Sequence, residues 1–226
     1  TLDRSSAASD VYKRQTISAP SVTYPTYLTI TTSENNKGDS DVAYRVWCND
    51  VLMATSVGTV SYQFGAGSYV CKLNTTAGPF ANWTVNSSIA SVTTSVNKGI
   101  LSGSLTISPG WTVTYPTTIS VGYSENNVGD ADVVYNIWRD NVKVGSETIE
   151  LGAGSYNYKL NSTGGANWTA NASIDVKTLV VNKGILSGSI SAPSVTYPNS
   201  LVVSTSENNK GDSDVNYKIY CGNVLI

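Results

Sequence analysis

The string SENN-x-GD-x-DV-x-Y occurs three times in the chain, at Ser33–Tyr44, Ser124–Tyr135 and Ser206–Tyr217. Asn, Gly and Asp fill the first part of each copy, as tight turns require. The last part begins an alternation of apolar and polar residues that is typical of a strand. The same unit recurs at intervals of about 85 residues, so the chain is a tandem array of one small module.

Three further strings keep constant places in this module. VTYP precedes every copy, whereas GAGSY and NKGILSG follow the first two copies only. They stand at Val22–Pro25, Val113–Pro116 and Val195–Pro198 for VTYP, at 65–69 and 152–156 for GAGSY, and at 97–103 and 182–188 for NKGILSG. Arrays of one small module usually serve as spacers, stalks or multivalent binders.

The first residues do not belong to the repeat. Residues 5–15 read SSAASDVYKRQ, and a back-translation of this stretch matches a transposon-type sequencing adaptor read in frame. We therefore expect residues 1–15 to be a non-native leader from the assembly of metagenomic DNA, although a genuine flexible leader is the alternative. We also expect the third module to be truncated, because it stops at Ile226, before its GAGSY and NKGILSG strings.

Composition argues against several classes of function. The formal net charge is −2 and no basic patch occurs, so nucleic acid is not an expected partner. No apolar run approaches the roughly 20 residues of a membrane helix, so we expect no membrane span in this fragment. The chain has no His, which removes Ser-His and Cys-His catalytic pairs, and three Cys without His argue against zinc. We expect no enzyme and no cofactor other than a candidate Ca²⁺.

Alternation of apolar and polar residues marks the strands of the module. Leu28 and Ile30 predict one strand with a single buried face, and Val42, Tyr44 and Val46 predict a second. The same positions are apolar or aromatic in the later copies, at Ile119, Val121, Leu201 and Val203 for the first strand and at Val133, Tyr135, Ile137, Val215, Tyr217 and Ile219 for the second. Short polar links after the second strand predict a hairpin.

The GAGSY string predicts a specific corner. A Gly-rich turn followed by Tyr69 or Tyr156, with an inward residue two places later, matches the tyrosine corner of immunoglobulin-like sandwiches. About seven short strands per module then predict an all-β chain of tandem immunoglobulin-like antiparallel β-sandwiches. The expected units are repeat 1 (residues 16–98), repeat 2 (residues 99–183) and a truncated repeat 3 (residues 184–226).

Taken together, these motifs resemble the Ig-like repeats of large archaeal and bacterial surface proteins of the S-layer or adhesin type. The resemblance implies an extracellular or cell-surface location and a non-catalytic stalk or spacer role. The expected partners are then the neighbouring repeats, with cell-surface glycans or proteins as further candidates. Two alternatives stay open: a Ca²⁺- or carbohydrate-binding module, and an accessory region of a secreted hydrolase.

The repeated loop concentrates the acidic residues. Carboxylates and Asn side chains are oxygen ligands for Ca²⁺, although the spacing differs from an EF-hand and a simple turn explains the same residues. The turn is the favoured interpretation. The candidate metal ligands are Glu34, Asp39, Asp41, Glu125, Asp130 and Asp132.

Two other residue sets are candidate surface sites. Strand parity predicts that the side chains of Trp47, Trp138 and Tyr220 point outward. Outward aromatic rings are able to stack on a sugar, but we favour cross-strand packing as their role. Six N-x-S/T sequons gather in one part of the module and are candidate glycosylation sites. They are Asn74, Asn82, Asn86, Asn161, Asn167 and Asn171.

Two cysteines change together between repeats. Cys48 and Cys71 face inward by parity in repeat 1, and repeat 2 has Arg139 and Tyr158 at the same positions. Paired loss predicts a Cys48–Cys71 disulfide, which suits an oxidising compartment. The alternative is two buried free thiols.

Overall fold

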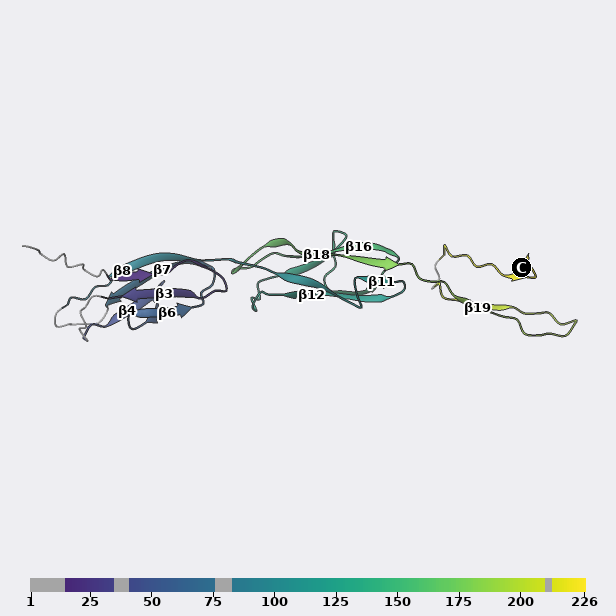
Figure 1. Cartoon of the computed structure of the whole chain (residues 1–226), viewed down its shortest axis with the longest axis horizontal. Helices are drawn as coiled ribbons and strands as arrows, with labels where there is room; N and C mark the ends of the chain where they lie inside the picture. Colours follow the sequence, from purple (N-terminus) through teal and green to yellow (C-terminus); the bar gives the residue numbers. More distant parts are fainter. Residues whose placement is uncertain (1–14, 35–40, 76–82, 210–212) are drawn as a thin grey trace, which may run out of the picture.

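The computed structural model describes residues 15–34, 41–75, 83–209 and 213–226. Its regular structure in these residues is all β, and the repeats follow one another end to end along the long axis (Figure 1). Repeats 1 and 2 are β-sandwiches, and the segment after them is more open. The chain is therefore a tandem β-sandwich protein, as the repeated motifs predict.

Each sandwich consists of a three-stranded and a five-stranded sheet. In repeat 1 the sheets have the orders β1-β3-β6 and β2-β8-β7-β4-β5. The first strand is divided into two pieces that join different sheets, so eight segments appear where about seven strands are expected. The strands are β1 (Thr16–Ser18), β2 (Val22–Thr23), β3 (Leu28–Ser33), β4 (Tyr44–Cys48), β5 (Val51–Ala54), β6 (Gly58–Tyr62), β7 (Gly67–Thr75) and β8 (Ala90–Asn97).

Repeat 2 has the same topology, with sheet orders β10-β12-β15 and β11-β18-β16-β13-β14. Its first strand is divided in the same way, and β11 pairs parallel with β18 as β2 does with β8. The strands are β10 (Gly103–Ser108), β11 (Thr112–Thr114), β12 (Thr118–Glu125), β13 (Tyr135–Arg139), β14 (Val142–Lys143), β15 (Glu147–Glu150), β16 (Gly154–Ser162) and β18 (Asn171–Asn182).

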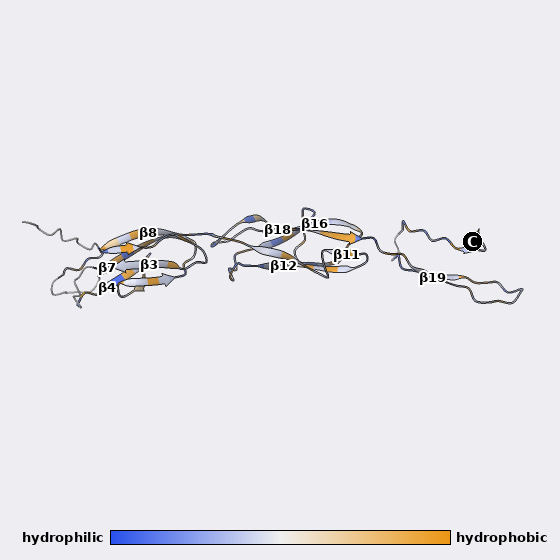
Figure 2. Cartoon of the chain, viewed as in Figure 1, coloured by the Kyte–Doolittle hydropathy of each residue, from blue (hydrophilic) through white to orange (hydrophobic). Residues whose placement is uncertain are grey.

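Each sandwich has its own hydrophobic core, formed by the alternating residues of its strands. In repeat 1 Leu28 and Ile30 are fully buried, and in repeat 2 Ile119 and Val121 are buried at the same places. One core cluster runs from Ala19 to Val96 and the other from Leu105 to Val181, so each lies within one expected repeat. Apolar segments alternate with polar ones along these strands (Figure 2).

The tyrosine corner forms in both sandwiches. The Tyr69 hydroxyl donates to the carbonyl oxygen of Gly65 at 2.8 Å, and the Tyr156 hydroxyl donates to that of Gly152 at 2.9 Å. This is the backward hydrogen bond that defines the motif. The GAGSY string therefore predicted the local structure correctly.

The predicted hairpin also forms in each copy. Its two-residue link has positive φ at both positions, at Asn49 and Asp50 in repeat 1 and at Asp140 and Asn141 in repeat 2. Type I′ turns need that geometry, and Asn and Asp tolerate it better than most residues. The turn keeps β4 and β5, and likewise β13 and β14, in antiparallel register.

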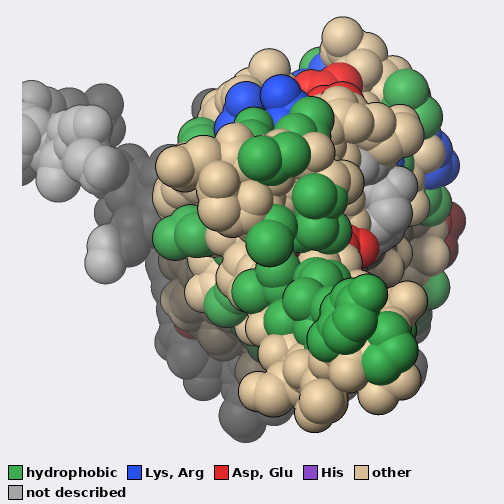
Figure 3. All heavy atoms as spheres, turned by 90° about the vertical axis from the view of Figure 1, so that its right-hand side faces the viewer, with side chains coloured by type: hydrophobic (Ala, Val, Ile, Leu, Met, Phe, Trp, Pro, Cys, Tyr) green, Lys and Arg blue, Asp and Glu red, His purple; other side chains and the backbone are tan. Residues whose placement is uncertain are grey.

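Repeat 3 differs from the expectation for both of its predicted strands. Leu201 and Val203 lie outside any strand, and Leu201 is 48% exposed. Val215, Tyr217 and Ile219 of the expected second strand also lie outside any strand, because no neighbouring strand pairs with them. Two separate strand pairs remain, β19 (Gly188–Ser191) with β20 (Ser204–Glu207) and β21 (Tyr220–Cys221) with β22 (Val224–Leu225). No second sheet faces these strands in the described part of this repeat, so most of its apolar side chains are exposed and none is fully buried. Hydrophobic side chains are visible over the C-terminal end of the molecule (Figure 3).

Candidate functional site: the junction between repeats

A segment of repeat 2 inserts against the end of repeat 1. Strand β17 (Trp168–Thr169) pairs parallel with β9 (Gly99–Ile100), which is the linker between the two sandwiches. Trp168 is 2% exposed, and its ring contacts the ring of Tyr24 from repeat 1 in a T-shaped arrangement at a centroid distance of 5.3 Å. Such aromatic pairs contribute about 0.5–1.5 kcal/mol beyond the area that they bury.

Asn167 forms hydrogen bonds across the same junction. Its side-chain Oδ1 accepts from the amide of Ala66 at 2.8 Å, and its carbonyl oxygen accepts from the amide of Gly99 at 2.9 Å. The Lys98 ammonium adds a third bond, donating to the carbonyl oxygen of Gly165 at 2.8 Å. The repeat 2 segment is thus bonded to the tyrosine corner of repeat 1 and to the linker.

The acidic loop of repeat 2 holds this segment from the other side. The Asn167 amide donates to both oxygens of Asp130 at 3.3 Å, and the Ala166 amide donates to Asp132 at 2.5 Å. The Trp168 indole nitrogen donates to the carbonyl oxygen of Asn127 at 3.1 Å. The loop that recurs in every copy therefore positions the residues that contact the preceding repeat.

Two glycines make the close approach possible. A Cβ on Gly99 would lie 2.6 Å from the Tyr24 carbonyl oxygen and 2.7 Å from the Trp168 ring. A Cβ on Gly65 would lie 2.8 Å from the Asn167 Oδ1. All three distances are shorter than real Cβ contacts, so a side chain at Gly99 would clash with backbone and ring atoms, and one at Gly65 would displace the Asn167 side chain from its place.

The electrostatics of the junction involve Tyr24. Burial and the neighbouring Asp130 carboxylate raise the pKa of Tyr24 above 10.0, so its phenol stays neutral at physiological pH. This places a carboxylate of repeat 2 beside a hydroxyl of repeat 1. The neutral phenol is the form that is compatible with the adjacent negative charge.

The predicted Ca²⁺ ligands have other partners in repeat 2. Glu125 accepts from the Asn127 amide at 2.6 Å, and Asp130 and Asp132 accept from the inserted segment. Within the described ranges no group of three or more His, Cys, Asp or Glu side chains gathers as a metal site would require. Of the repeat 1 candidates, Glu34 and Asp41 are described, and Asp39 lies outside the described residues. These contacts support the turn interpretation, and Ca²⁺ binding stays a prediction.

The sequon asparagines lie in different surroundings. Asn86 is exposed, Asn74, Asn161 and Asn171 are partly buried, and Asn82 lies outside the described residues. The Asn167 amide nitrogen, to which a glycan would be attached, donates to Asp130 at the junction. A glycan there would break the contacts described above, so Asn86 is the better candidate site.

A disulfide joins Cys48 and Cys71 in repeat 1, with a Cα–Cα distance of 4.1 Å and a sequence separation of 23. The two cysteines are directly opposite each other on β4 and β7. Narrow, non-hydrogen-bonded pairs of an antiparallel sheet bring Cα atoms to about 4.5 Å, which suits a cross-strand bridge.

In repeat 2, Arg139 and Tyr158 occupy the same cross-strand positions. Both bind the Glu147 carboxylate, the Arg139 guanidinium at 2.8 Å and the Tyr158 hydroxyl at 2.7 Å. A hydrogen-bonded polar trio, with Tyr158 buried and the other two side chains partly buried, thus stands in one sandwich where a covalent bridge stands in the other. Sequence reasoning missed Glu147, because the segment that carries it differs in length between copies.

Trp138 lines a small pocket of about 300 Å³ on the outer face of repeat 2. Asp140, Asn157 and Lys159 share the pocket, and the buried Trp138 indole nitrogen has no hydrogen-bond partner in the structure. The outward orientation predicted from strand parity places both Trp47 and Trp138 in partly buried positions. Cross-strand neighbours of Trp138 are Lys143 and Lys159.

The sequence held one signal for the junction. The string ANWT occurs at 81–84 and at 166–169, and its sequence pattern identifies only a glycosylation sequon. A Trp inside a polar loop had no strand periodicity to assign it to a core. Only the structure shows that this Trp packs on the preceding repeat.

The fold and the junction together define a chain of tandem β-sandwich repeats whose neighbours interlock. No family model and no curated protein matches the chain. Among solved structures it is similar to the Clostridium thermocellum CbhA fibronectin(III)-like modules, at 14% identity and a TM-score of 0.27, over 75% of this chain and 94% of the other. It is also similar to three N-terminal domains of the bacteriophage RB49 highly immunogenic outer capsid protein, at 14% identity and a TM-score of 0.31, over 88% and 71% respectively.

Proposed function

We propose that the chain is a non-catalytic structural region of a secreted or cell-surface protein, in which tandem sandwiches act as a semi-rigid stalk or spacer. The observation that carries this proposal is the insertion of Asn167 and Trp168 of repeat 2 against Ala66 and Tyr24 of repeat 1. A chain that needed only flexible tethering would have no use for the buried Trp168 at this junction.

One feature of the structure supports the extracellular part of the proposal. The Cys48–Cys71 disulfide suits an oxidising compartment, since cytosolic thiols are usually kept reduced. The resemblance of the repeat motifs to surface-protein repeats agrees with this location. Independently of location, no helix in the described ranges is long and apolar enough to cross a membrane.

The spacer role is tested by measuring how firmly the two sandwiches are oriented. Spin labels on Ser61→Cys in β6 and Thr148→Cys in β15, in a chain with Cys221→Ser, report the distance between repeats by pulsed electron resonance. Both labelled positions are exposed. A single narrow distance distribution that broadens with Trp168→Ala supports a semi-rigid spacer, whereas a broad distribution in the parent chain contradicts it.

A carbohydrate-binding role is the second candidate, and the pocket beside Trp138 favours it. An aromatic ring with nearby amide, carboxylate and ammonium groups is a combination that recognises sugars through stacking and hydrogen bonds. Titration with glycans while Trp fluorescence is followed tests it. Saturable quenching that disappears with Trp138→Phe and Asn157→Ala would support binding, and no change at millimolar glycan would exclude it.

A further inference from the structure

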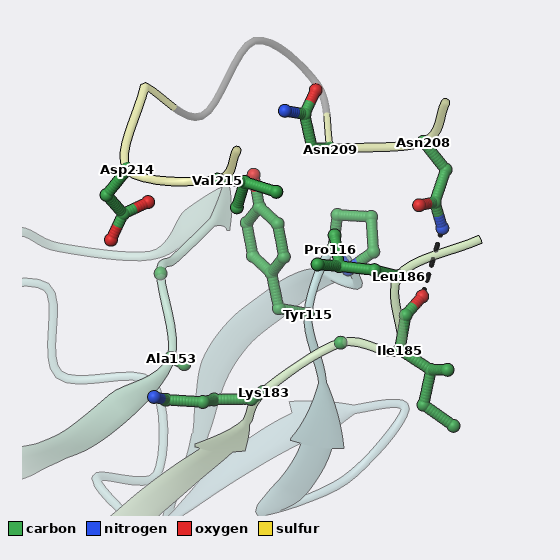
Figure 4. A pocket seen from close by; sticks show the side chains of 12 residues that line it. Tyr115, Pro116, Ala153, Lys183, Ile185, Leu186, Asn208, Asn209, Asp214 and Val215 are labelled. Atoms are coloured by element: carbon green, nitrogen blue, oxygen red, sulfur yellow. Dashed lines mark hydrogen bonds between the residues drawn. The ribbon is translucent and has the colours of Figure 1, made fainter. Parts of the chain in front are cut away.

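A pocket of about 690 Å³ lies at the junction between repeats 2 and 3. Figure 4 shows Tyr115, Pro116 and Lys183 on its repeat 2 side and Asn208, Asn209, Asp214 and Val215 on its repeat 3 side. Nothing in the proposed spacer role explains an open pocket at this place. Its walls, however, have counterparts elsewhere in the chain.

The residues that line the pocket correspond, position by position, to residues of the first junction. Tyr115 corresponds to Tyr24 in the VTYP string, and the Gly-Ala pair of GAGSY is shared. The remaining lining residues correspond in the NKGILSG and SENN strings. The pairs are Gly152 with Gly65, Ala153 with Ala66, Lys183 with Lys98, Gly184 with Gly99, Asn208 with Asn126, Asn209 with Asn127, and Asp214 with Asp132.

The walls also keep the hydrogen bonds of the first junction. The Tyr115 amide donates to the Asn182 carbonyl oxygen at 2.9 Å, as the Tyr24 amide donates to that of Asn97 at 3.0 Å. On the other wall, the Ser187 amide donates to the side chain of Asn208 at 2.7 Å. Its counterpart, the Ser102 amide, donates to Asn126 at 2.8 Å. Both walls of the pocket are therefore already arranged as in the first junction.

The two junctions differ in what lies between these walls. A Cβ on Gly99 would meet the Tyr24 carbonyl oxygen on one side and the Trp168 ring on the other. The three atoms nearest to a Cβ on Gly184 would all belong to Tyr115, the closest being its carbonyl oxygen at 2.5 Å. Gly99 is buried and Gly184 is exposed. The pocket is thus the space that Asn167 and Trp168 fill at the first junction.

We propose that this pocket is a binding site for a Gly-Gly-Ala-Asn-Trp-Thr segment, the repeat 3 counterpart of Gly164–Thr169. The indole packs on Tyr115 and Gly184, and the Asn side chain accepts from the Ala153 amide. The Asn carbonyl oxygen accepts from the Gly184 amide, and Lys183 donates to the glycine carbonyl. The proposal rests on the spacer role of the first junction and extends it to a rule: each repeat supplies the Asn-Trp pair that locks it onto the one before.

The proposal is tested by extending the chain so that it contains the missing Gly-Gly-Ala-Asn-Trp-Thr segment. Ile226 corresponds to Val144 of repeat 2, so appending a copy of residues 145–183 after Ile226 gives repeat 3 its own Asn-Trp pair. Amide hydrogen exchange of Ala153 and Gly184, measured by NMR with and without the extension, reports occupancy of the site. Each amide gains a hydrogen bond, which predicts exchange slower by about tenfold or more.

A matched variant blocks the site without touching the segment. Gly152→Ala places a methyl group where the Asn side chain docks, as Gly65 shows at the first junction. In repeat 2 itself the nearest atom to that Cβ is the Tyr156 hydroxyl at 4.0 Å, so the sandwich should keep its melting temperature. In the extended chain, Gly152→Ala or Trp→Ala in the appended segment should return both amides to fast exchange.

Unchanged exchange at Ala153 and Gly184 in an extended chain would overturn the proposal, whether or not the appended residues fold. Exchange that slows equally with the Gly152→Ala variant would overturn it as well. Either failure leaves the spacer role standing if Trp168→Ala still loosens the first junction. Loss of that first-junction effect would instead count against the spacer role.

Discussion

The ring of Trp168 in repeat 2 lies against the ring of Tyr24 in repeat 1, with centroids 5.3 Å apart and planes at 89°. Neither sandwich alone can bury both rings. The stability of repeat 2 therefore depends on repeat 1, because Trp168 loses its partner when repeat 1 unfolds. Coupling of this nearest-neighbour kind is what makes repeat arrays cooperative.

Trp168→Ala should lower the free energy of unfolding by about 3–5 kcal/mol, the range for truncating a buried Trp. It should also separate one cooperative thermal transition into two, since the junction no longer couples the sandwiches. Calorimetry of the full chain measures both effects. Trp83→Ala, the exposed counterpart in repeat 1, is the matched control and should cost less than about 1 kcal/mol. Equal losses in the two variants would contradict this account of the junction.

The Cys48–Cys71 bridge should stabilise repeat 1 alone. Its 23-residue separation corresponds to roughly 3 kcal/mol in the chain-entropy model. Cys48→Ala with Cys71→Ala should therefore lower the melting temperature of repeat 1 and leave that of repeat 2 nearly unchanged. Denaturant unfolding followed by NMR signals from each sandwich separates the two. An equal loss in both repeats would show that the effect passes through the junction.

Repeat 2 should weaken in alkali because of Tyr158. Burial, with the hydrogen bond to Glu147, raises the pKa of the Tyr158 phenol well above 10.0 in the folded chain. A raised folded pKa means that the stabilisation is complete below about pH 10 and is lost as pH rises towards the folded value. Stability should fall by roughly 1.4 kcal/mol per pH unit from this group. Tyr158→Phe should remove this pH dependence of stability. Identical pH profiles for the parent chain and the variant would exclude this role for Tyr158.

Calcium should have little effect on stability. Asp130 and Asp132 accept hydrogen bonds from the junction segment, so a cation would compete with contacts that already exist. We expect the melting temperature to change by less than about 2 °C at 1 mM Ca²⁺, since a native-state ligand would raise it by mass action. A rise of about 5 °C or more that disappears in Asp39→Ala with Asp130→Ala would establish a Ca²⁺ site.

Local patterns were enough to predict the sandwiches. The alternation at Leu28 and Ile30 assigned a buried face correctly, because period-2 patterns report which side of a strand faces a core. The GAGSY string predicted the Tyr69 corner, because that hydrogen bond spans only four residues. Leu201 followed the same pattern, yet it is exposed, since burial also needs a facing sheet.

The junction could not be predicted in the same way. Asn167 meets Ala66 across 101 residues of sequence, and no local pattern specifies which loop faces which repeat. The trio around Glu147 was hidden for a related reason: its partners are cross-strand neighbours whose register depends on the whole sheet. Comparison of the repeats did show that Arg139 and Tyr158 together replace the two cysteines. It did not show which interaction takes the place of the disulfide.

Residual dipolar couplings of the full chain test the central claim most directly, because they report whether repeats 1 and 2 share one orientation. If Asn167 and Trp168 lock the junction, couplings from both sandwiches should fit a single alignment tensor. Trp168→Ala should then give two tensors of different magnitude. Two different tensors in the parent chain, or one shared tensor that survives both Trp168→Ala and Asn167→Ala, would contradict the account.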